Sequence, residues 1–237
     1  MPMNGEANPA LTCISSMATR AVLNELCAWY ARETGQRVNV GSAGGVDAFR
    51  RVREGEPFDF VVLASEAIER LTEADRVDPR TRRALVRADI AIAVRAGATR
   101  PDIGSEEAVR AAVLTARAIG HSTGPSGAYL MRLLERWGVA ERVAARLVQA
   151  PPGVPVATLV ARGAVDLGFQ QLSELVGAPG IDVVGLLPPA LRHATVFAGA
   201  VCTASGRRQD ATTLLAFLAS DATDATKRRY GLEPAPG

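Results

Sequence analysis

The sequence predicts an α/β fold with mostly parallel strands that are covered on both faces by helices. Short, almost continuously apolar runs alternate with longer segments whose apolar residues recur at helical spacing. Several of these runs end in small serine or glycine residues, and a helical pattern follows at once. This alternation is typical of parallel sheets, whose ligands lie beyond the carboxyl ends of the strands.

The elements follow one another from end to end of the chain. Apolar runs predict strands at 11–15, 37–40, 58–64, 88–94, 116–120, 147–150, 165–169, 181–187 and 194–203. Helical spacing predicts helices at 17–33, 46–53, 66–74, from 105 onward, and at 129–137, 156–162, 172–176, 212–219 and 222–229.

Composition excludes several classes of protein. The chain has 237 residues and a net charge of +2, and its arginines form no run longer than two, so no nucleic-acid partner is predicted. Two histidines and three cysteines, Cys13, Cys27 and Cys202, form no closely spaced ligand set, so no metal site is expected. A nucleotide-phosphate loop is missing as well, and no cofactor is predicted.

The sequence also bears on location. Residues 1–10 carry neither the basic nor the apolar segment of a signal peptide, and no apolar stretch has the length of a membrane span. We therefore expect a cytoplasmic protein without a transporter partner. If a leader had been removed, the location would be periplasmic instead.

One motif, residues 120–129 with the sequence G-H-S-T-G-P-S-G-A-Y, is the clearest of several strand–turn–helix junctions. The first N–H groups of a helix have no partner within the helix and lie at the positive end of its dipole, so they bind anions. The other junctions follow the strands near residues 15, 41 and 64. We expect several helix starts to converge on one small anionic ligand.

At this point the residues resemble a known family. The stretches S-S-M-A-T-R at 15–20, G-S-A-G-G-V-D-A-F-R at 41–50, G-P-S-G-A-Y at 124–129 and A-R-G-A-V-D-L-G-F at 161–169 are similar in order and spacing to solute-binding proteins of the type II periplasmic-binding fold, molybdate-binding group. The resemblance implies two α/β lobes that close over a small anion. It places lobe one at residues 1–86 and 195–237, and lobe two at 87–194.

The resemblance also assigns ligand contacts to the turns. The family's first-turn serine matches Ser15 or Ser16, and its second-turn hydroxyl lies among Ser42, Ala43 and Gly44. The third turn matches at Ser126 and Gly127, the proline-rich turn near Val154, and the strand after it at Gln171. Gln171 stands where the family has a tyrosine, and its amide both donates and accepts hydrogen bonds. The residues themselves add two candidate contacts. Ser65 lies at the end of a further strand, before a helix. Arg20 lies near the first turn, where an arginine that faces the ligand would favour a carboxylate or phosphate.

Two functions remain open. The first is a protein that binds a small anion, an organic carboxylate or an oxyanion, without chemistry. The second is a cytoplasmic isomerase of an unsaturated tricarboxylate, as in the aconitate-isomerase-like members of this family, which needs a base for an allylic proton. Glu66 and His121 are the candidate bases, whereas Tyr129 and Gln170 are interpreted as packing or rim residues.

Overall fold

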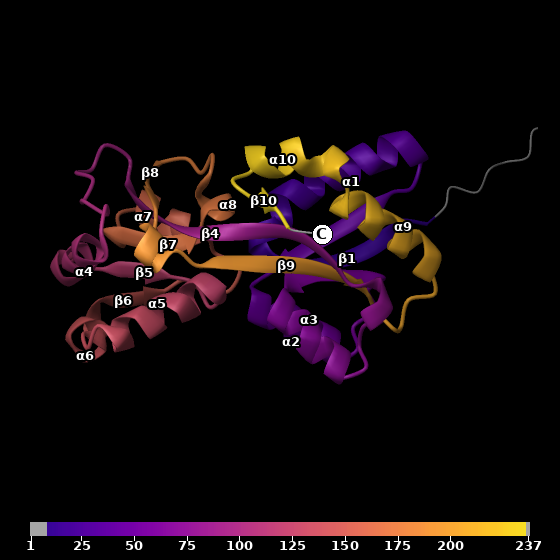
Figure 1. The fold of residues 1–237 in the computed structure, drawn as a ribbon, viewed down its shortest axis with the longest axis horizontal. Coiled ribbons are helices and arrows are strands. Elements are labelled where there is room, and N and C mark those ends of the chain that lie inside the picture. The colour runs from indigo at the N-terminus through magenta and orange to yellow at the C-terminus, as the bar shows by residue number, and fades with distance from the viewer. Residues whose placement is uncertain (1–8, 236–237) are drawn as a thin grey trace, which may run out of the picture.

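The computed structural model describes residues 9–235, which form two lobes joined by two long strands (Figure 1). Residues 1–8 and 236–237 lie outside the described part. The prediction about a leader concerns residues 1–10, and the predicted lobe one begins at residue 1 and ends at residue 237, so both predictions extend into these undescribed residues. Eight of the strands are hydrogen-bonded in the order β2-β1-β3-β9-β4-β7-β5-β6, and β8 and β10 both pair with β4. The α/β class and the two-lobed architecture are confirmed.

The first lobe is built on three parallel strands, β1 (Leu11–Ser16), β2 (Val38–Ala43) and β3 (Phe60–Ala64). Successive residues of β3 are buried on opposite faces, Phe60 and Val62 in one core and Val61 and Leu63 in the other. A strand covered on both faces is apolar at almost every position, as the sequence predicted. The register places Ser15 beside Ser42, so both turns lie at the same edge of the sheet.

Helices cover both faces of this lobe. One face is covered by α1 (Arg20–Thr34), α9 (Arg208–Ala219) and α10 (Asp224–Arg229), and the other by α2 (Gly45–Arg53) and α3 (Ser65–Glu73). The shorter elements are η1 (Met17–Thr19), η2 (Pro79–Thr81), η5 (Asp221–Thr223) and β10 (Glu233–Pro234).

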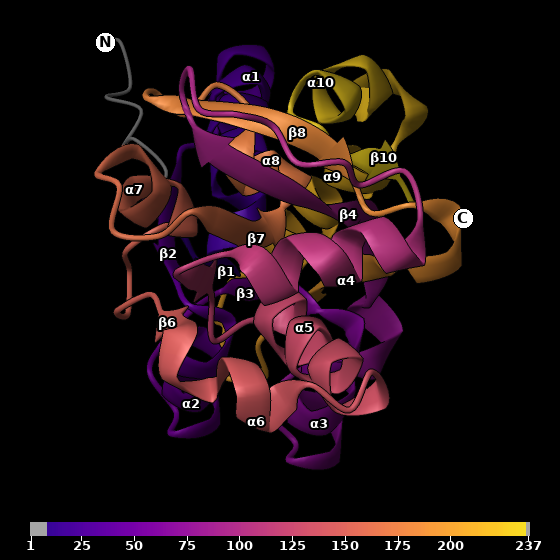
Figure 2. The same cartoon turned by 90° about the vertical axis from the view of Figure 1, so that its left-hand side faces the viewer.

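The second lobe repeats this plan on β5 (Ile119–His121), β6 (Leu147–Gln149) and β7 (Leu167–Gln171), which are parallel. In Figure 2, α4 and α5 lie in front of these strands. Its remaining elements are α4 (Glu106–Thr115), α5 (Pro125–Arg136), α6 (Ala140–Val143), η3 (Ala144–Arg146), α7 (Val156–Ala161), α8 (Leu172–Leu175), β8 (Ile181–Leu186) and η4 (Pro189–Leu191). A Cβ on Gly168 would lie 2.5 Å from Val160 Cγ2, so this glycine lets α7 pack closely on β7.

The two lobes are joined by the antiparallel pair β4 (Arg83–Arg95) and β9 (Ala194–Val201). The mostly parallel arrangement therefore holds within each lobe, while the connecting strands add antiparallel pairings. β4 is longer than predicted, because exposed residues, among them Arg83 and Arg87, interrupt the apolar pattern of its first half. Val86 belongs to a core of the first lobe and Ile92 to a core of the second. The predicted lobe boundaries fall within or beside these strands and remain predictions.

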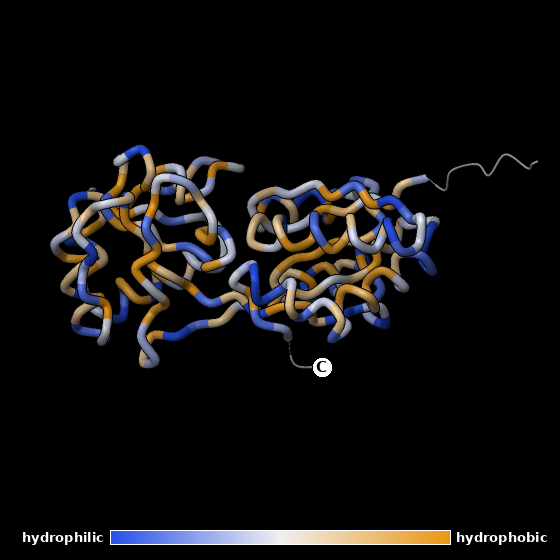
Figure 3. Tube along the Cα trace, turned by 90° about the horizontal axis from the view of Figure 1, so that it is seen from above, coloured by the Kyte–Doolittle hydropathy of each residue, from blue (hydrophilic) through white to orange (hydrophobic). Residues whose placement is uncertain are grey.

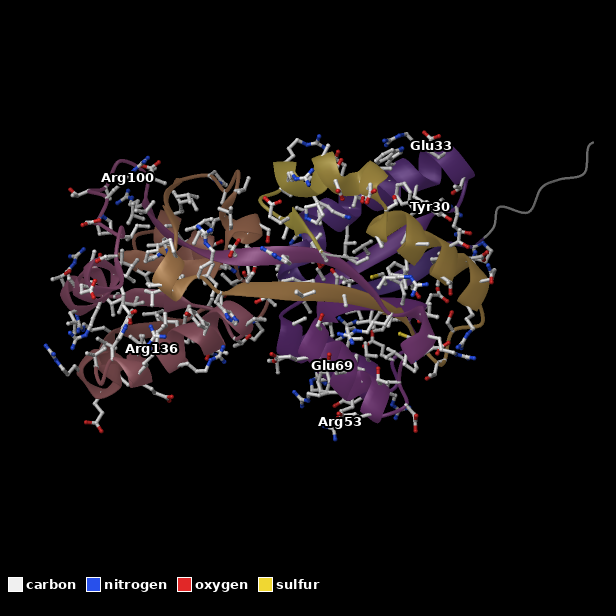
Figure 4. All side chains as sticks on the ribbon, in the orientation of Figure 1. Tyr30, Glu33, Arg53, Glu69, Arg100 and Arg136 are labelled. Carbon is white, nitrogen blue, oxygen red and sulfur yellow. The ribbon has the colours of Figure 1, made fainter. Side chains whose placement is uncertain are left out.

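Viewed from above, the apolar segments gather in two separate interiors with a narrow connection between them (Figure 3). Charged side chains lie on the outside of both lobes, among them Arg53, Arg100 and Arg136 (Figure 4). Cys13, Cys27 and Cys202 are buried free thiols, as expected, and burial raises the pKa of Cys27 and of Cys202 to about 12. None of the helices within residues 9–235 is long and apolar enough to cross a membrane.

Candidate functional site

A cavity of about 210 Å³ lies between the lobes, and turns from both lobes line it. The turns that follow β1, β2, β5, β6 and β7 all contribute, as expected for carboxyl ends of strands in α/β folds. Five of the predicted contact residues line this cavity: Ser16, Gly44, Ser126, Val154 and Gln171. That these residues contact a ligand remains a prediction.

Four helix starts converge on this cavity. The N-cap residues of η1, α2, α5 and α7 are Ser16, Gly44, Gly124 and Pro155, and all four line it. No side chain of the N-cap residue caps α2 or α5, so the first-turn N–H groups of these helices are available to a ligand. Each N-terminus carries a partial positive charge, and their convergence favours an anion.

The first-lobe part of the site rests on paired hydroxyl groups. The Oγ atoms of Ser15 and Ser42 lie 2.8 Å apart, and Ser15 is fully buried. Ser15, Ser42 and Ala43 do not line the cavity, whereas Ser16 and Gly44 do. Ser15 and Ser42 therefore hold the two turns together, and Ser16 and Gly44 face the ligand space.

The second-lobe part is the motif at residues 120–129. Ser122 Oγ lies 3.1 Å from Ser126 Oγ and accepts a hydrogen bond of 3.1 Å from the N–H of Gly124. A Cβ on Gly127 would lie 1.8 Å from the carbonyl oxygen of Ser122, so only glycine fits this close backbone approach. Gly127 does not line the cavity but shapes the turn that does. The helix start at α5 is therefore rigidly built.

Sequence reasoning missed a carboxyl group in this cavity, Glu174 on α8. Gln170 Nε2 donates a hydrogen bond of 2.6 Å to Glu174 Oε2, and Gln170 Oε1 accepts one of 2.9 Å from the N–H of Val156. Burial raises the pKa of Glu174 to about 7, and the hydrogen bond from Gln170 lowers it only in part. Near neutral pH this group can both accept and donate a proton.

Gln170, which the sequence predicts to be a packing or rim residue, also contacts other polar groups of the cavity. Its side chain is buried and lines the cavity, where it connects the start of α7 to Glu174. The only signal in the sequence is the spacing from Gln170 to Glu174, four residues across a strand–helix junction. The packing interpretation holds for Tyr129, which stacks on His193 with ring centroids 4.4 Å apart.

Gln171 points away from Gln170, because adjacent residues of β7 face opposite sides of the strand. Its side chain reaches β4 and β9, the two strands that join the lobes and are called the hinge strands below. With the amide oriented so that both its atoms find partners, Nε2 donates to the carbonyls of Ala88 and Asp89 at 3.0 and 3.2 Å, and Oε1 accepts from Thr195 Oγ1 at 3.0 Å. Gln171 lines the cavity, but its amide is occupied by the hinge. The family's tyrosine contact is therefore not reproduced by this side chain.

The structure does not bring the other candidates to the same place. Arg20 is exposed at the start of α1 and does not line the cavity. His121 is buried, and its Nδ1 lies 3.1 Å from the carbonyl oxygen of Ser122, so its role is structural. Ser65 and Glu66 line a neighbouring cavity of about 300 Å³ beside the hinge, together with His193. Neither candidate base lies in the 210 Å³ cavity, because neither β5 nor α3 directs its side chain there.

With this geometry established, comparison with known proteins gives the family. Residues 11–233 match the bacterial extracellular solute-binding protein family, and the chain belongs to it. Solved structures confirm the fold. The periplasmic molybdate-binding protein of Azotobacter vinelandii superimposes with a TM-score of 0.80 at 19% identity, covering 96% of this chain and 100% of that one. A sulfate-binding protein of Mycobacterium tuberculosis gives a TM-score of 0.75 at 16% identity, with coverage of 96% and 88%.

A curated relative is more similar in sequence. The chain is 33% identical over 231 residues to an aconitate isomerase of a Pseudomonas species, and the match covers 95% of this chain and 88% of that protein. The family is described as extracellular, whereas the cytoplasmic location expected from the sequence remains a prediction. The distant solved structures establish the fold alone, so the ligand has to be inferred from the site.

Proposed function

We propose that this protein isomerises an unsaturated tricarboxylate by allylic proton transfer, as an aconitate isomerase does. The observation that carries the proposal is Glu174, a carboxyl group with a pKa of about 7 in a cavity where several anion-favouring helix starts meet and the other carboxylate, Asp47, is paired with Arg50. The relative at 33% identity supports the same reaction class. The site thereby combines a base with groups that stabilise negative charge.

The reaction needs one group that moves a proton. Ionised Glu174 takes a proton from the CH₂ group allylic to the double bond, and the C–H electron pair shifts into the carbon chain. The resulting dienolate carries its charge on a substrate carboxylate, where first-turn N–H groups of α2 and α5 stabilise it. Protonated Glu174 then returns the proton to the other end of the three-carbon unit. The double bond has moved, and the carboxyl group is regenerated.

Gln170 fixes the orientation of the Glu174 carboxyl group and influences its protonation. Its amide holds Glu174 Oε2 at 2.6 Å, which leaves the second carboxyl oxygen for the substrate. Since Gln170 is itself anchored by the N–H of Val156, the carboxyl group has a defined orientation. A pKa near the operating pH gives useful amounts of both protonation states, which a single acid–base residue requires.

Binding without chemistry is the second candidate, and the molybdate- and sulfate-binding neighbours favour it. A receptor that only binds an oxyanion needs no group that accepts and returns a proton near neutral pH. A proton-transfer enzyme needs such a group. The cavity chemistry therefore favours the isomerase over the simple receptor.

The decisive experiment follows trans-aconitate as it converts to the cis acid, with wild type, Glu174→Gln and the control Glu107→Gln. Glu107 is exposed on α4, outside the cavity, and its replacement should leave turnover unchanged. Loss of the base should lower kcat by about 100- to 10,000-fold. Ligand-induced thermal stabilisation should remain, since the helix starts are intact.

Other outcomes separate the candidates. Stabilisation of wild type by trans-aconitate without any conversion would leave the receptor as the function. If Glu174→Gln converts the substrate as fast as wild type, Glu174 is not the base.

A further inference from the structure

The ligand cavity continues into a second space that the reaction described above does not use. A cavity of about 490 Å³ lies between α2 and α3 of one lobe and the start of α5 of the other, elements that face each other in Figure 1. It shares residues of the ligand cavity, among them Ser16, Gly45, Arg50 and Gly124, so the two spaces are continuous. A ligand held at the helix starts can therefore extend into it.

The walls of this second space are largely apolar, with one oriented cation. Phe49, Leu63 and Phe197 contribute apolar surface. The guanidinium of Arg70, on α3, lies over the Phe49 ring with its Cζ 4.4 Å from the ring centroid. Stacking on an aromatic ring fixes the plane of the guanidinium and leaves the N–H groups at its edge to bind other groups.

Arg50 and Arg70 both line this space, but their partners differ. Arg50 forms ion pairs with Asp47 and Glu54 at 2.5 and 2.8 Å, so carboxylates of the protein already neutralise it. Among the described residues, Arg70 has the Phe49 ring as its partner and neither an ion pair nor a side-chain hydrogen bond. Arg70 is thus the cation of this space that can receive a carboxylate from a ligand.

Glu66 also lines this space, one turn before Arg70 on α3, and it is the group that could compete for the guanidinium. Glu66 and Arg70 form no ion pair in the structure, and Glu66 also borders the hinge cavity that contains His193. The i,i+4 position alone therefore does not neutralise Arg70.

We infer that the 490 Å³ space is a subsite for a second carboxylate of the substrate, which Arg70 binds through two parallel N–H···O bonds while Phe49 contacts the carbon chain. This inference rests on the proposed function and specifies its substrate class. Neutral helix-start donors alone compensate poorly for several negative charges, whereas one unpaired guanidinium favours di- and tricarboxylates over monocarboxylates.

The test measures dissociation constants by calorimetry for trans-aconitate and for the monocarboxylate crotonate, with wild type, Arg70→Gln and Arg70→Lys. The control is Arg110→Gln, which replaces an exposed arginine of α4 outside both cavities. Arg70→Gln should raise the Kd for trans-aconitate by about ten- to a hundredfold and leave that for crotonate unchanged. Arg70→Lys should recover part of this loss, because a lysine keeps the charge without the bidentate geometry.

The outcomes distinguish the subsite from the proposed function. If the wild type is active and the ratio of the Kd for trans-aconitate to the Kd for crotonate is the same in Arg70→Gln as in wild type, the subsite is overturned and the proposed isomerase function stands. Wild type that neither binds nor converts any carboxylate overturns both. Since Arg70 is exposed, the melting temperature without ligand should be the same in all variants, and a fall confined to Arg70→Gln would count as a structural role that contradicts the subsite.

Discussion

The two lobes contribute different chemistry to the shared cavity. The first lobe presents the hydroxyl group of Ser16, backbone donors at Gly44, and the ion-paired side chains of Asp47 and Arg50. The second lobe presents a helix start as well, but adds Gln170 and Glu174, a pair whose charge changes near pH 7. On the proposed function, the first lobe binds the anion, while the second both binds it and moves the proton.

The largest expected effect on stability comes from replacing a glycine in the first turn of a helix, and it should differ between one such glycine in each lobe. Gly127→Ala should lower the free energy of unfolding by about 3 kcal/mol, because its Cβ would lie 1.8 Å from the Ser122 carbonyl oxygen. Gly45→Ala is the matched control, since a Cβ there meets no atom within 4 Å. Urea unfolding checks both variants. Equal stability of the two would show that the second-lobe turn is not rigid.

An intermediate effect concerns the charge of Glu174. Its pKa is raised from 4.5 when unfolded to about 7 when folded, so the folded state binds more protons between these values, and wild-type stability should fall as pH rises from 4.5 to 7. The loss should amount to about 1–3 kcal/mol. Glu174→Gln should lack this loss, so the variant should become the more stable protein above pH 7. Urea unfolding of both proteins from pH 4.5 to 8 measures this loss. If the free energy of unfolding changes with pH in the same way for both proteins, the raised pKa is contradicted.

The smallest effect tests how the lobes are joined beside the base. Ser173, next to Glu174, donates a hydrogen bond of 2.8 Å across the lobes to the carbonyl of Ala18. Ser173→Ala should therefore raise the Kd of trans-aconitate by up to about tenfold, because the closed arrangement loses about 1 kcal/mol. The control Ser220→Ala removes a hydroxyl that bonds within its own lobe, to the carbonyl of Phe217. Calorimetry measures the Kd of trans-aconitate for both variants. Equal Kd values would show that the hydrogen bond of Ser173 between the lobes does not contribute to ligand binding.

Much of the fold follows from local patterns. The continuous apolar run at β3 and the serine and glycine turns after β1, β2 and β5 predicted buried strands whose ends form the cavity. These features are local in sequence, because strand burial and helix starts depend on neighbouring residues. The long first half of β4 was missed, since its exposed arginines break the apolar pattern.

The site was predictable only in part, for a physical reason visible in two adjacent residues. Gln170 and Gln171 have the same side chain, yet the pleat of β7 turns one toward Glu174 and the other toward the hinge strands. The sequence alone determined the α/β class, the helix starts and the preference for an anion. Only the tertiary structure decided which carboxyl group is enclosed, because burial raises a pKa through contacts between segments distant in the chain. It added Glu174 to the candidate bases Glu66 and His121, and Glu174 is the one that lines the 210 Å³ cavity.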